Sequence, residues 1–300
     1  MQTGTILSAL ELWAHPSLQE QYDNSGLITG NRSWDCKGIL ISLDATEDVV
    51  HDAVKLGCNL IIAHHPIVFK GLKSLTGKTY IEKTVITAIK NDIAIYALHT
   101  NLDNISNGVN AAMAQKLGLE NCRILLPKPS QLKKLFTFVP IADAEKLKAA
   151  IFIAGGGHIG NYSEASFSTE GTGTFKPEAG ANPTIGAIGT REEVQEVKLE
   201  IIFPAWLQND VIAAMKDAHP YEEVAYDVVS LDNDFQEVGS GLLGELPVEL
   251  PENDFLQLLK DRFGLQVIRH TTFTQKPIKK VAVCGGAGSF LTGKALASGA

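Results

Sequence analysis

The stretch LIIAHHPIVFKG, from Leu60 to Gly71, places two adjacent histidines directly after an apolar run. Residues 59–63, which overlap the start of this stretch, predict a buried strand, because short apolar runs rich in β-branched residues are typical of strands inside a sheet. Successive strand residues point to opposite faces, so His64 and His65 reach one site only if the chain bends before Pro66. The pair therefore marks the end of this strand as the first place to look for chemistry.

Helical and strand patterns alternate on both sides of this stretch. We expect further strands at 38–44 and 93–100, and helices at 5–15, 45–57, 79–92 and 107–119. Strands that alternate with helices of this length predict β-α-β units and a parallel sheet. This alternating pattern of a parallel sheet returns near the C-terminus, with a helix at 253–264, a strand at 279–283 and a helix at 289–298.

A second domain interrupts this pattern. Residues 126–134, LPKPSQLKK, contain two prolines and three lysines and read as a boundary. The following order of strand, helix, strands, helix and strand is that of a ferredoxin-like α+β module, with a region rich in glycine, serine and threonine at 155–189 that predicts turns and antiparallel hairpins. We therefore assign residues 1–129 and 236–300 to a discontinuous core domain and residues 130–235 to an inserted domain.

Composition excludes several classes of protein. Of 300 residues, 45% are apolar and 20% are charged, and the net charge of −8 lacks the basic footprint of a nucleic-acid-binding protein. The four cysteines are far apart and form no CxxC pair, which argues against a zinc ribbon or a disulfide framework. The N-terminus has no signal-peptide pattern and no apolar run reaches membrane-spanning length, so we expect a soluble, cytoplasmic protein without a membrane partner.

Polar residues follow several of the predicted strands. They are Asp44, the pair His64 and His65, His99 with the nearby Asp103, and the glycine-rich CGGAGS at 284–289. Ligands of open parallel sheets bind outside the carboxyl ends of the strands. Histidines and a carboxylate gathered at one such edge predict a site for divalent metal ions such as zinc, iron or manganese.

Some of these residues have a second interpretation. Asp44 or Thr46 could cap the following helix, His99 could support a ligand or lie in the core, and Lys70 could face solvent or an anionic substrate. The CGGAGS turn lacks the spacing of a phosphate-binding loop, which favours a tight turn that needs small residues beside a crowded site. The segment AHPYEEVAYDV, 218–228, could form an effector site, but a turn into an edge strand is the simpler interpretation.

Three motifs resemble the NIF-three-like family, also described as YbgI-type dinuclear metal-centre proteins or GTP cyclohydrolase 1 type 2 homologs. They are LIIAHHPIVFKGLKSL at 60–75, YALHTNLDN at 96–104 and DNSGLITG at 23–30. Residues 155–186 and 219–228 resemble the PII/CutA-like domain that is inserted in long bacterial members. The resemblance implies an α/β metal-binding core with a mixed, largely parallel sheet, and an inserted ferredoxin-like α+β domain.

The resemblance also implies a site and an assembly. By position, His64, His65 and Asp103 correspond to ligands of two divalent metal ions. Apart from the resemblance, His99, Lys70 and Asp44 are candidates for supporting the ligands or meeting substrate. The family adds a histidine and a glutamate near its C-terminus, after the point where this sequence stops at Ala300, so we expect a longer natural chain. It also implies a hexamer, a trimer of dimers, that binds a small molecule such as a nucleotide.

Two functions of different classes follow. The first is a dinuclear metal-dependent hydrolase, in which the metal ions activate water, with GTP ring opening suggested by the family name. The alternative is a non-enzymatic metal-binding or regulatory scaffold that senses a small molecule through the inserted domain, by analogy of fold. Nucleic-acid binding ranks last because the chain is acidic.

Overall fold

The computed structural model describes all residues from Met1 to Ala300. The chain divides into two compact units. Unit 1 contains Met1–Pro127 and Gln236–Ala300, and unit 2 contains Lys128–Phe235. None of the helices combines the length and the apolarity that a bilayer-spanning segment needs.

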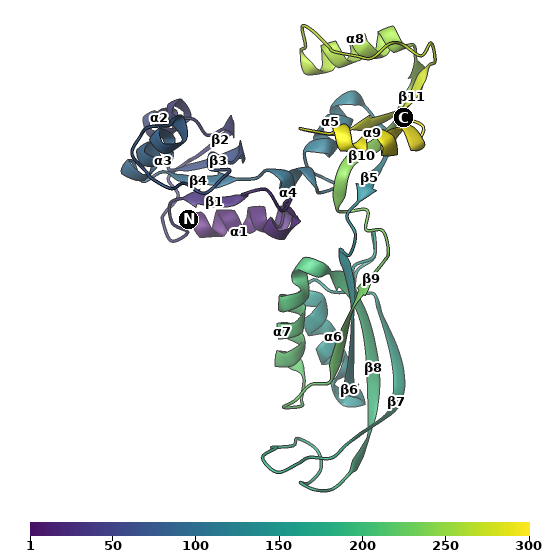
Figure 1. Ribbon diagram of the computed structural model, residues 1–300. Helices are drawn as coiled ribbons and strands as arrows, with labels where there is room; N and C mark the ends of the chain where they lie inside the picture. Colours follow the sequence, from purple (N-terminus) through teal and green to yellow (C-terminus); the bar gives the residue numbers. More distant parts are fainter. The chain divides into compact units, whose positions relative to one another are not determined.

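The first sheet of unit 1 contains the strand that ends in the histidine pair. Its order is β1 (Gly26–Thr29), β4 (Ala94–Ala97), β3 (Leu60–His65) and β2 (Ile39–Asp44). The last three strands are mutually parallel, whereas β1 runs antiparallel to β4 (Figure 1). The prediction of a mixed, largely parallel sheet is thus confirmed. The antiparallel member is the short β1, a strand that the sequence did not predict.

Helices α2 (Glu47–Lys55) and α3 (Tyr80–Lys90) cover one face of this sheet. They begin at the N-cap threonines 46 and 79, whose hydroxyls accept hydrogen bonds from backbone amides of the first turn. Their apolar sides share a core with β3 and β4, formed by Val50, Ala53, Val85, Ala88, Ile61 and Ile95. Helix α1 (Thr3–Trp13) lies on the other side of the sheet (Figure 1).

A second sheet of unit 1 is antiparallel. Its order is β11 (Ile278–Val283), β10 (Gly239–Leu250) and β5 (Glu120–Pro127). Helices α5 (Val109–Leu117) and α8 (Glu252–Phe263) pack on it, and a short 3₁₀ turn with α9 (Thr292–Ala297) follows β11. The expectation that the strand at 279–283 returns to the parallel pattern was wrong, because the long β10 provides antiparallel partners for both β5 and β11.

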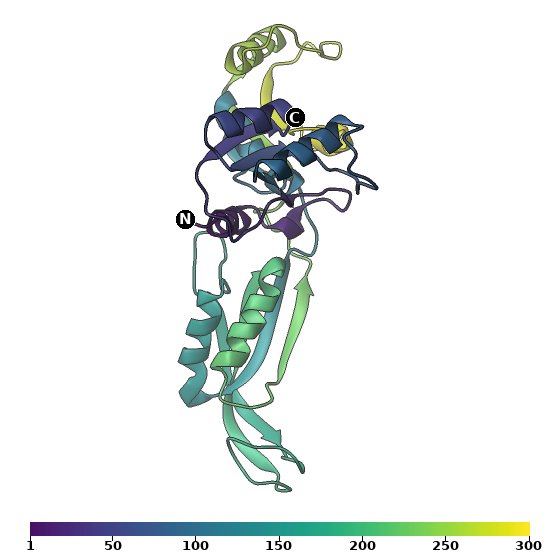
Figure 2. The same ribbon diagram turned by 90° about the vertical axis from the view of Figure 1, so that its left-hand side faces the viewer.

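Unit 2 is a single sheet with two helices. Its elements follow the order β-α-β-β-α-β: β6 (Leu132–Pro140), α6 (Ala144–Ile153), β7 (Ser166–Phe175), β8 (Glu192–Pro204), α7 (Gln208–Ala218) and β9 (Tyr226–Leu231). All strands pair antiparallel in the order β7-β8-β6-β9 (Figure 1). The two helices lie next to each other on one face of this sheet (Figure 2). This is ferredoxin-like connectivity; a closer likeness to PII or CutA proteins stays a prediction.

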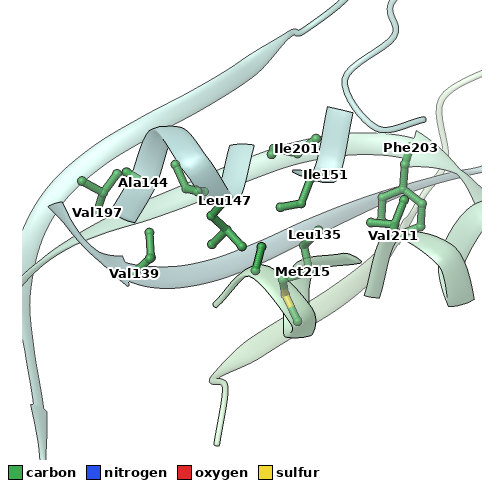
Figure 3. Close-up of a cluster of buried hydrophobic side chains, with 12 residues drawn as sticks. Leu135, Val139, Ala144, Leu147, Ile151, Val197, Ile201, Phe203, Val211 and Met215 are labelled. Atoms are coloured by element: carbon green, nitrogen blue, oxygen red, sulfur yellow. The ribbon is translucent and has the colours of Figure 1, made fainter. Parts of the chain in front are cut away.

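The core of unit 2 lies between the sheet and its helices. Figure 3 shows side chains of β6 and β8, among them Leu135 and Ile201, packed against Leu147 of α6 and Met215 of α7. Residues alternate along each strand, so the inward positions of β8 are apolar and the intervening positions face away from the helices. No helix covers this second face of the sheet within unit 2.

Candidate metal centre

Three histidines of unit 1 form a close cluster. The ring centroids of His64 and His65 lie 5.0 Å apart, and that of His99 lies 5.3 Å and 5.6 Å from them. One ligating nitrogen of each residue lies within 4.8 Å of those of the other two. The two residues at the end of β3 therefore converge with the third histidine, as a metal site requires.

A short helix brings Asp103 to this cluster. The predicted strand at 93–100 ends earlier, at Ala97, and residues Thr100–Asp103 form the single-turn helix α4. The backbone amide of His99 donates to Oδ1 of Asn101, 3.0 Å away, which fixes the entry into this turn. As a result, Oδ1 of Asp103 lies 3.9 Å from Nε2 of His64.

Each histidine has an acceptor at its Nδ1. The acceptors are the carbonyl of Leu98 for His64 at 2.7 Å, Asp44 for His65 at 2.8 Å and Asp23 for His99 at 2.7 Å. An acceptor at Nδ1 places the proton there, so the neutral ring keeps a lone pair on Nε2. This is the arrangement by which partners behind the ligands orient metal-binding imidazoles.

Asp23 belongs to the site although its sequence context does not mark it as a candidate. Its side chain is fully buried and also accepts hydrogen bonds from the backbone and hydroxyl of Thr100. Burial raises its pKa, but the hydrogen bonds from His99 and Thr100 outweigh this and hold the pKa far below the usual value. The bond to Asp23 in turn raises the pKa of His99. In the sequence, the one sign of a role for Asp23 is that it begins the motif DNSGLITG.

Asp103 shows that the donor set fits a cation. Its Oδ1 is buried without a hydrogen-bond partner, and burial raises the pKa of this carboxyl, opposed by the nearby His64 and His99. A buried carboxylate oxygen without a partner carries a desolvation cost that a cation would offset. Imidazole nitrogens beside one such oxygen form a donor set suited to zinc, iron or manganese.

The remaining candidates lie around this cluster. The exposed side chain of Lys70 follows Phe69, whose ring centroid is 6.2 Å from that of His99, but Lys70 itself forms no hydrogen bond or ion pair with the histidines. Thr46 rather than Asp44 caps α2, which leaves Asp44 as the hydrogen-bond partner of His65. The choice between Asp44 and Thr46 as the cap of α2 is thereby decided, whereas an exposed Lys70 fits either of its two roles.

The CGGAGS turn lies behind Asp103. Asn110 links the two, since its amide donates to the backbone carbonyl of Asp103 at 2.9 Å and its Oδ1 accepts from the amide of Gly285 at 2.8 Å. A Cβ atom at position 285 would lie 3.6 Å from Oδ1 of Asp103 and 3.2 Å from Val109. The turn is therefore crowded, in agreement with its small residues.

Comparison with known proteins gives concordant matches over the whole chain. The model of the family described as Duf34/NIF3 (NGG1p interacting factor 3) matches residues 1–300. The GTP cyclohydrolase 1 type 2 homolog of Halalkalibacterium halodurans is 41% identical over 297 residues, which cover 99% of this chain and 80% of that protein. The Bacillus subtilis protein of the same name is 39% identical over 285 residues, 95% of this chain and 76% of its own.

Solved structures agree with these matches. The crystal structure of a Bacillus cereus protein related to NIF3 superposes with a TM-score of 0.87 at 42% identity and covers 100% of this chain and 80% of its own. The Staphylococcus aureus protein SA1388 gives a TM-score of 0.75 at 27% identity and covers 100% and 79%, respectively. This chain thus spans about four fifths of these relatives.

Proposed function

The chain belongs to the Duf34/NIF3 family, and from this premise we propose that it binds divalent metal ions at the histidine cluster and uses them in hydrolysis. One observation carries the proposal. The unpartnered, buried Oδ1 of Asp103 lies beside Nε2 of His64, within a group of imidazoles whose Nδ1 atoms are already engaged. Such an arrangement is costly without a cation and suited to one.

Different residues have different roles in this proposal. His64, His65 and Asp103 hold the metal, and His99 is either a further ligand or a support for one. When bound, a divalent ion would lower the pKa of water and polarise a substrate bond. Asp44 and Asp23 orient the imidazoles of His65 and His99 by accepting from Nδ1, so that Nε2 carries the lone pair in the neutral ring.

The substrate class that we propose is a nucleotide such as GTP, after the name of the relatives. An aromatic pair beside the cluster supports a flat ligand, since the rings of Tyr22 and Phe69 have centroids 6.2 Å apart and Phe69 contacts the ring of His99. Stacking on such side chains accepts any base. Lys70, which follows Phe69, would meet the phosphates.

The assembly that we propose is a hexamer of this chain.

Metal analysis tests the proposal. The purified 300-residue chain is incubated separately with Zn²⁺, Fe²⁺ and Mn²⁺, desalted and analysed for bound metal, beside His64→Ala, Asp103→Ala and, as a matched control, the exposed His51→Ala of α2. We expect at least one ion in the wild type and in the control, and strong loss in the other two. Equal metal contents in all four chains would contradict the proposed site.

Turnover separates the hydrolase from the alternative, a metal-binding or regulatory scaffold. Metal-loaded wild-type chain is incubated with GTP, and ring-opened and dephosphorylated products are separated by chromatography. Product that requires metal and disappears in His64→Ala supports the hydrolase. Bound metal without product favours the scaffold.

A further inference from the structure

Unit 2 contains a cavity on the sheet face that its helices leave uncovered. The cavity has a volume of about 650 Å³, and strand β7, the loop that follows it and the segment at 221–225 line it. Clefts of this size accept drug-sized molecules. The metal centre has no part in it, because all lining residues belong to unit 2.

A buried carboxylate lies in the wall of this cavity. Glu196 of β8 occupies a position next to the inward-facing Val197 and so belongs to the uncovered face, yet it is only 8% exposed. Its Oε1 accepts a hydrogen bond from the hydroxyl of Tyr221, 2.9 Å away. One neutral hydrogen bond leaves the charge of a buried carboxylate without a counterion, which is costly unless a cation joins it.

Two glycines border this carboxylate: Gly171 faces open space, and Gly173 lets the carboxylate lie against the backbone. Gly171 of β7 pairs with Glu196 across the sheet, and a Cβ atom there would meet no atom within 4 Å. At Gly173 a Cβ atom would lie 2.0 Å from Oε2 of Glu196, so any larger residue would displace the carboxylate. Glycine inside a strand often marks a place where another group approaches the backbone.

Hydrogen bonds hold the loop that forms the opposite wall. The backbone amide of Asn182 donates to Glu222 at 2.9 Å, and the hydroxyl of Thr184 donates to the carbonyl of Pro220 at 2.8 Å. Below the loop, the rings of Phe175 and Tyr221 contact each other with centroids 5.8 Å apart. The aromatic wall and the carboxylate are therefore in place before any ligand binds, which lowers the cost of binding.

The charge of the lining selects the ligand. Lys198 is the one cation among the lining residues, and its Nζ is 2.9 Å from Glu200, which is outside the lining, and 4.6 Å from the ring centroid of Phe136. Four carboxylates remain, from Glu170, Glu196, Glu222 and Glu223. We propose that this cavity binds a small apolar or aromatic molecule with a protonated amino group, which pairs with Glu196 while its body lies against Phe175 and Tyr221.

Binding of matched probes to the full 300-residue chain tests this proposal. Equilibrium dialysis measures tryptamine, phenethylamine and cyclohexylmethylamine, with indole-3-acetate as an aromatic anion. The variants are Glu196→Gln, which removes the charge and keeps the shape, Tyr221→Phe, and the control Glu145→Gln at an exposed position of α6. We expect at least one amine to bind the wild type and Glu145→Gln with equal affinity. Its affinity for Glu196→Gln should be lower by about tenfold or more.

Other results of the binding experiment would contradict the proposed amine site. Binding of the anion as strongly as the amines, no binding of any amine, or equal binding to Glu196→Gln would each overturn the proposal. Tyr221→Phe keeps the ring and the charge, so retained amine binding in this variant with loss in Glu196→Gln assigns the effect to the carboxylate. His64→Ala must bind the amines like the wild type; failure there would place the amine at the metal centre and overturn the site in unit 2.

Discussion

Nδ1 of His99 donates a hydrogen bond to Oδ1 of Asp23, 2.7 Å away, although the two residues are 76 positions apart in the sequence. The Asp23 side chain is fully buried, whereas that of His99 is 19% exposed. Because Nδ1 is engaged, Nε2 is the ring nitrogen that stays available to a metal ion. This pair therefore determines the orientation of one edge of the candidate metal centre.

Asp23→Asn should weaken metal binding by about 10- to 100-fold, because the loss of the carboxylate charge weakens the bond that holds the His99 ring and its tautomer. Competition with a chromogenic chelator measures the affinity. The matched control is Asp52→Asn, an exposed position on α2. Unchanged affinity in Asp23→Asn would show that His99 is not oriented by this bond.

Asp44→Asn should have a smaller effect than Asp23→Asn on the same affinity. The side chains of Asp44 and His65 are 59% and 47% exposed, so water can replace the lost interaction. We expect a decrease of less than about tenfold in the chelator assay. A larger loss than in Asp23→Asn would show that the Asp44–His65 bond matters more for metal affinity than the Asp23–His99 bond.

Leu147→Ala should destabilise unit 2 by about 2–5 kcal/mol, since it removes a fully buried side chain from the core in Figure 3 and leaves a cavity. Ile153→Ala is the control on the same helix, because Ile153 is 89% exposed. Hydrogen exchange read by mass spectrometry should report faster exchange in β6 and β8 and unchanged exchange in β3. Equal acceleration in β3 would indicate that the two units unfold together.

The stability of unit 1 should depend on pH through Glu82. Its carboxylate accepts hydrogen bonds from the amides of Thr76 and Lys78, 2.9 Å and 3.0 Å away, and these bonds lower its pKa below the usual 4.5. A carboxyl whose folded-state pKa is lowered stabilises the fold above the unfolded-state value and loses this contribution as the pH falls through the folded-state pKa.

Urea unfolding of the metal-free chain at several pH values checks this. Glu82→Gln should unfold at lower urea than the wild type at pH 7, and the difference should shrink below about pH 4.5 as the wild-type carboxyl becomes protonated. Glu120→Gln, at an exposed position, serves as the control. A difference that is independent of pH would assign the effect to shape instead of charge.

The sequence predicts much of the parallel sheet because its strands and helices carry strong local patterns. The run before His64 and the helices that begin after Thr46 and Thr79 are of this kind. It does not predict β1 or α4, because four residues are too few for a periodic signal. The pairing of β11 with β10 is also hidden, since the partner of a strand is set by long-range packing rather than by its own residues.

The sequence likewise indicates some residues of the candidate site and not others. Adjacent histidines before a proline, and a third with an aspartate four residues later, attract attention in the linear sequence. Asp23 does not, because its role depends on a contact with His99 that only the folded chain creates. The cavity of unit 2 depends likewise on Glu196 and Tyr221, which only the fold brings together.

The ends of β5 and β10 have a consequence for how such a protein can change. Pro127, the last residue before unit 2, is the sheet partner of Gly239, which follows unit 2 closely. The chain thus leaves and re-enters unit 1 at neighbouring positions of one antiparallel ladder, where a tight turn would close an ordinary hairpin. Unit 2 is therefore a removable module: its gain or loss leaves the histidine-bearing sheet intact, so the two candidate sites are free to evolve separately.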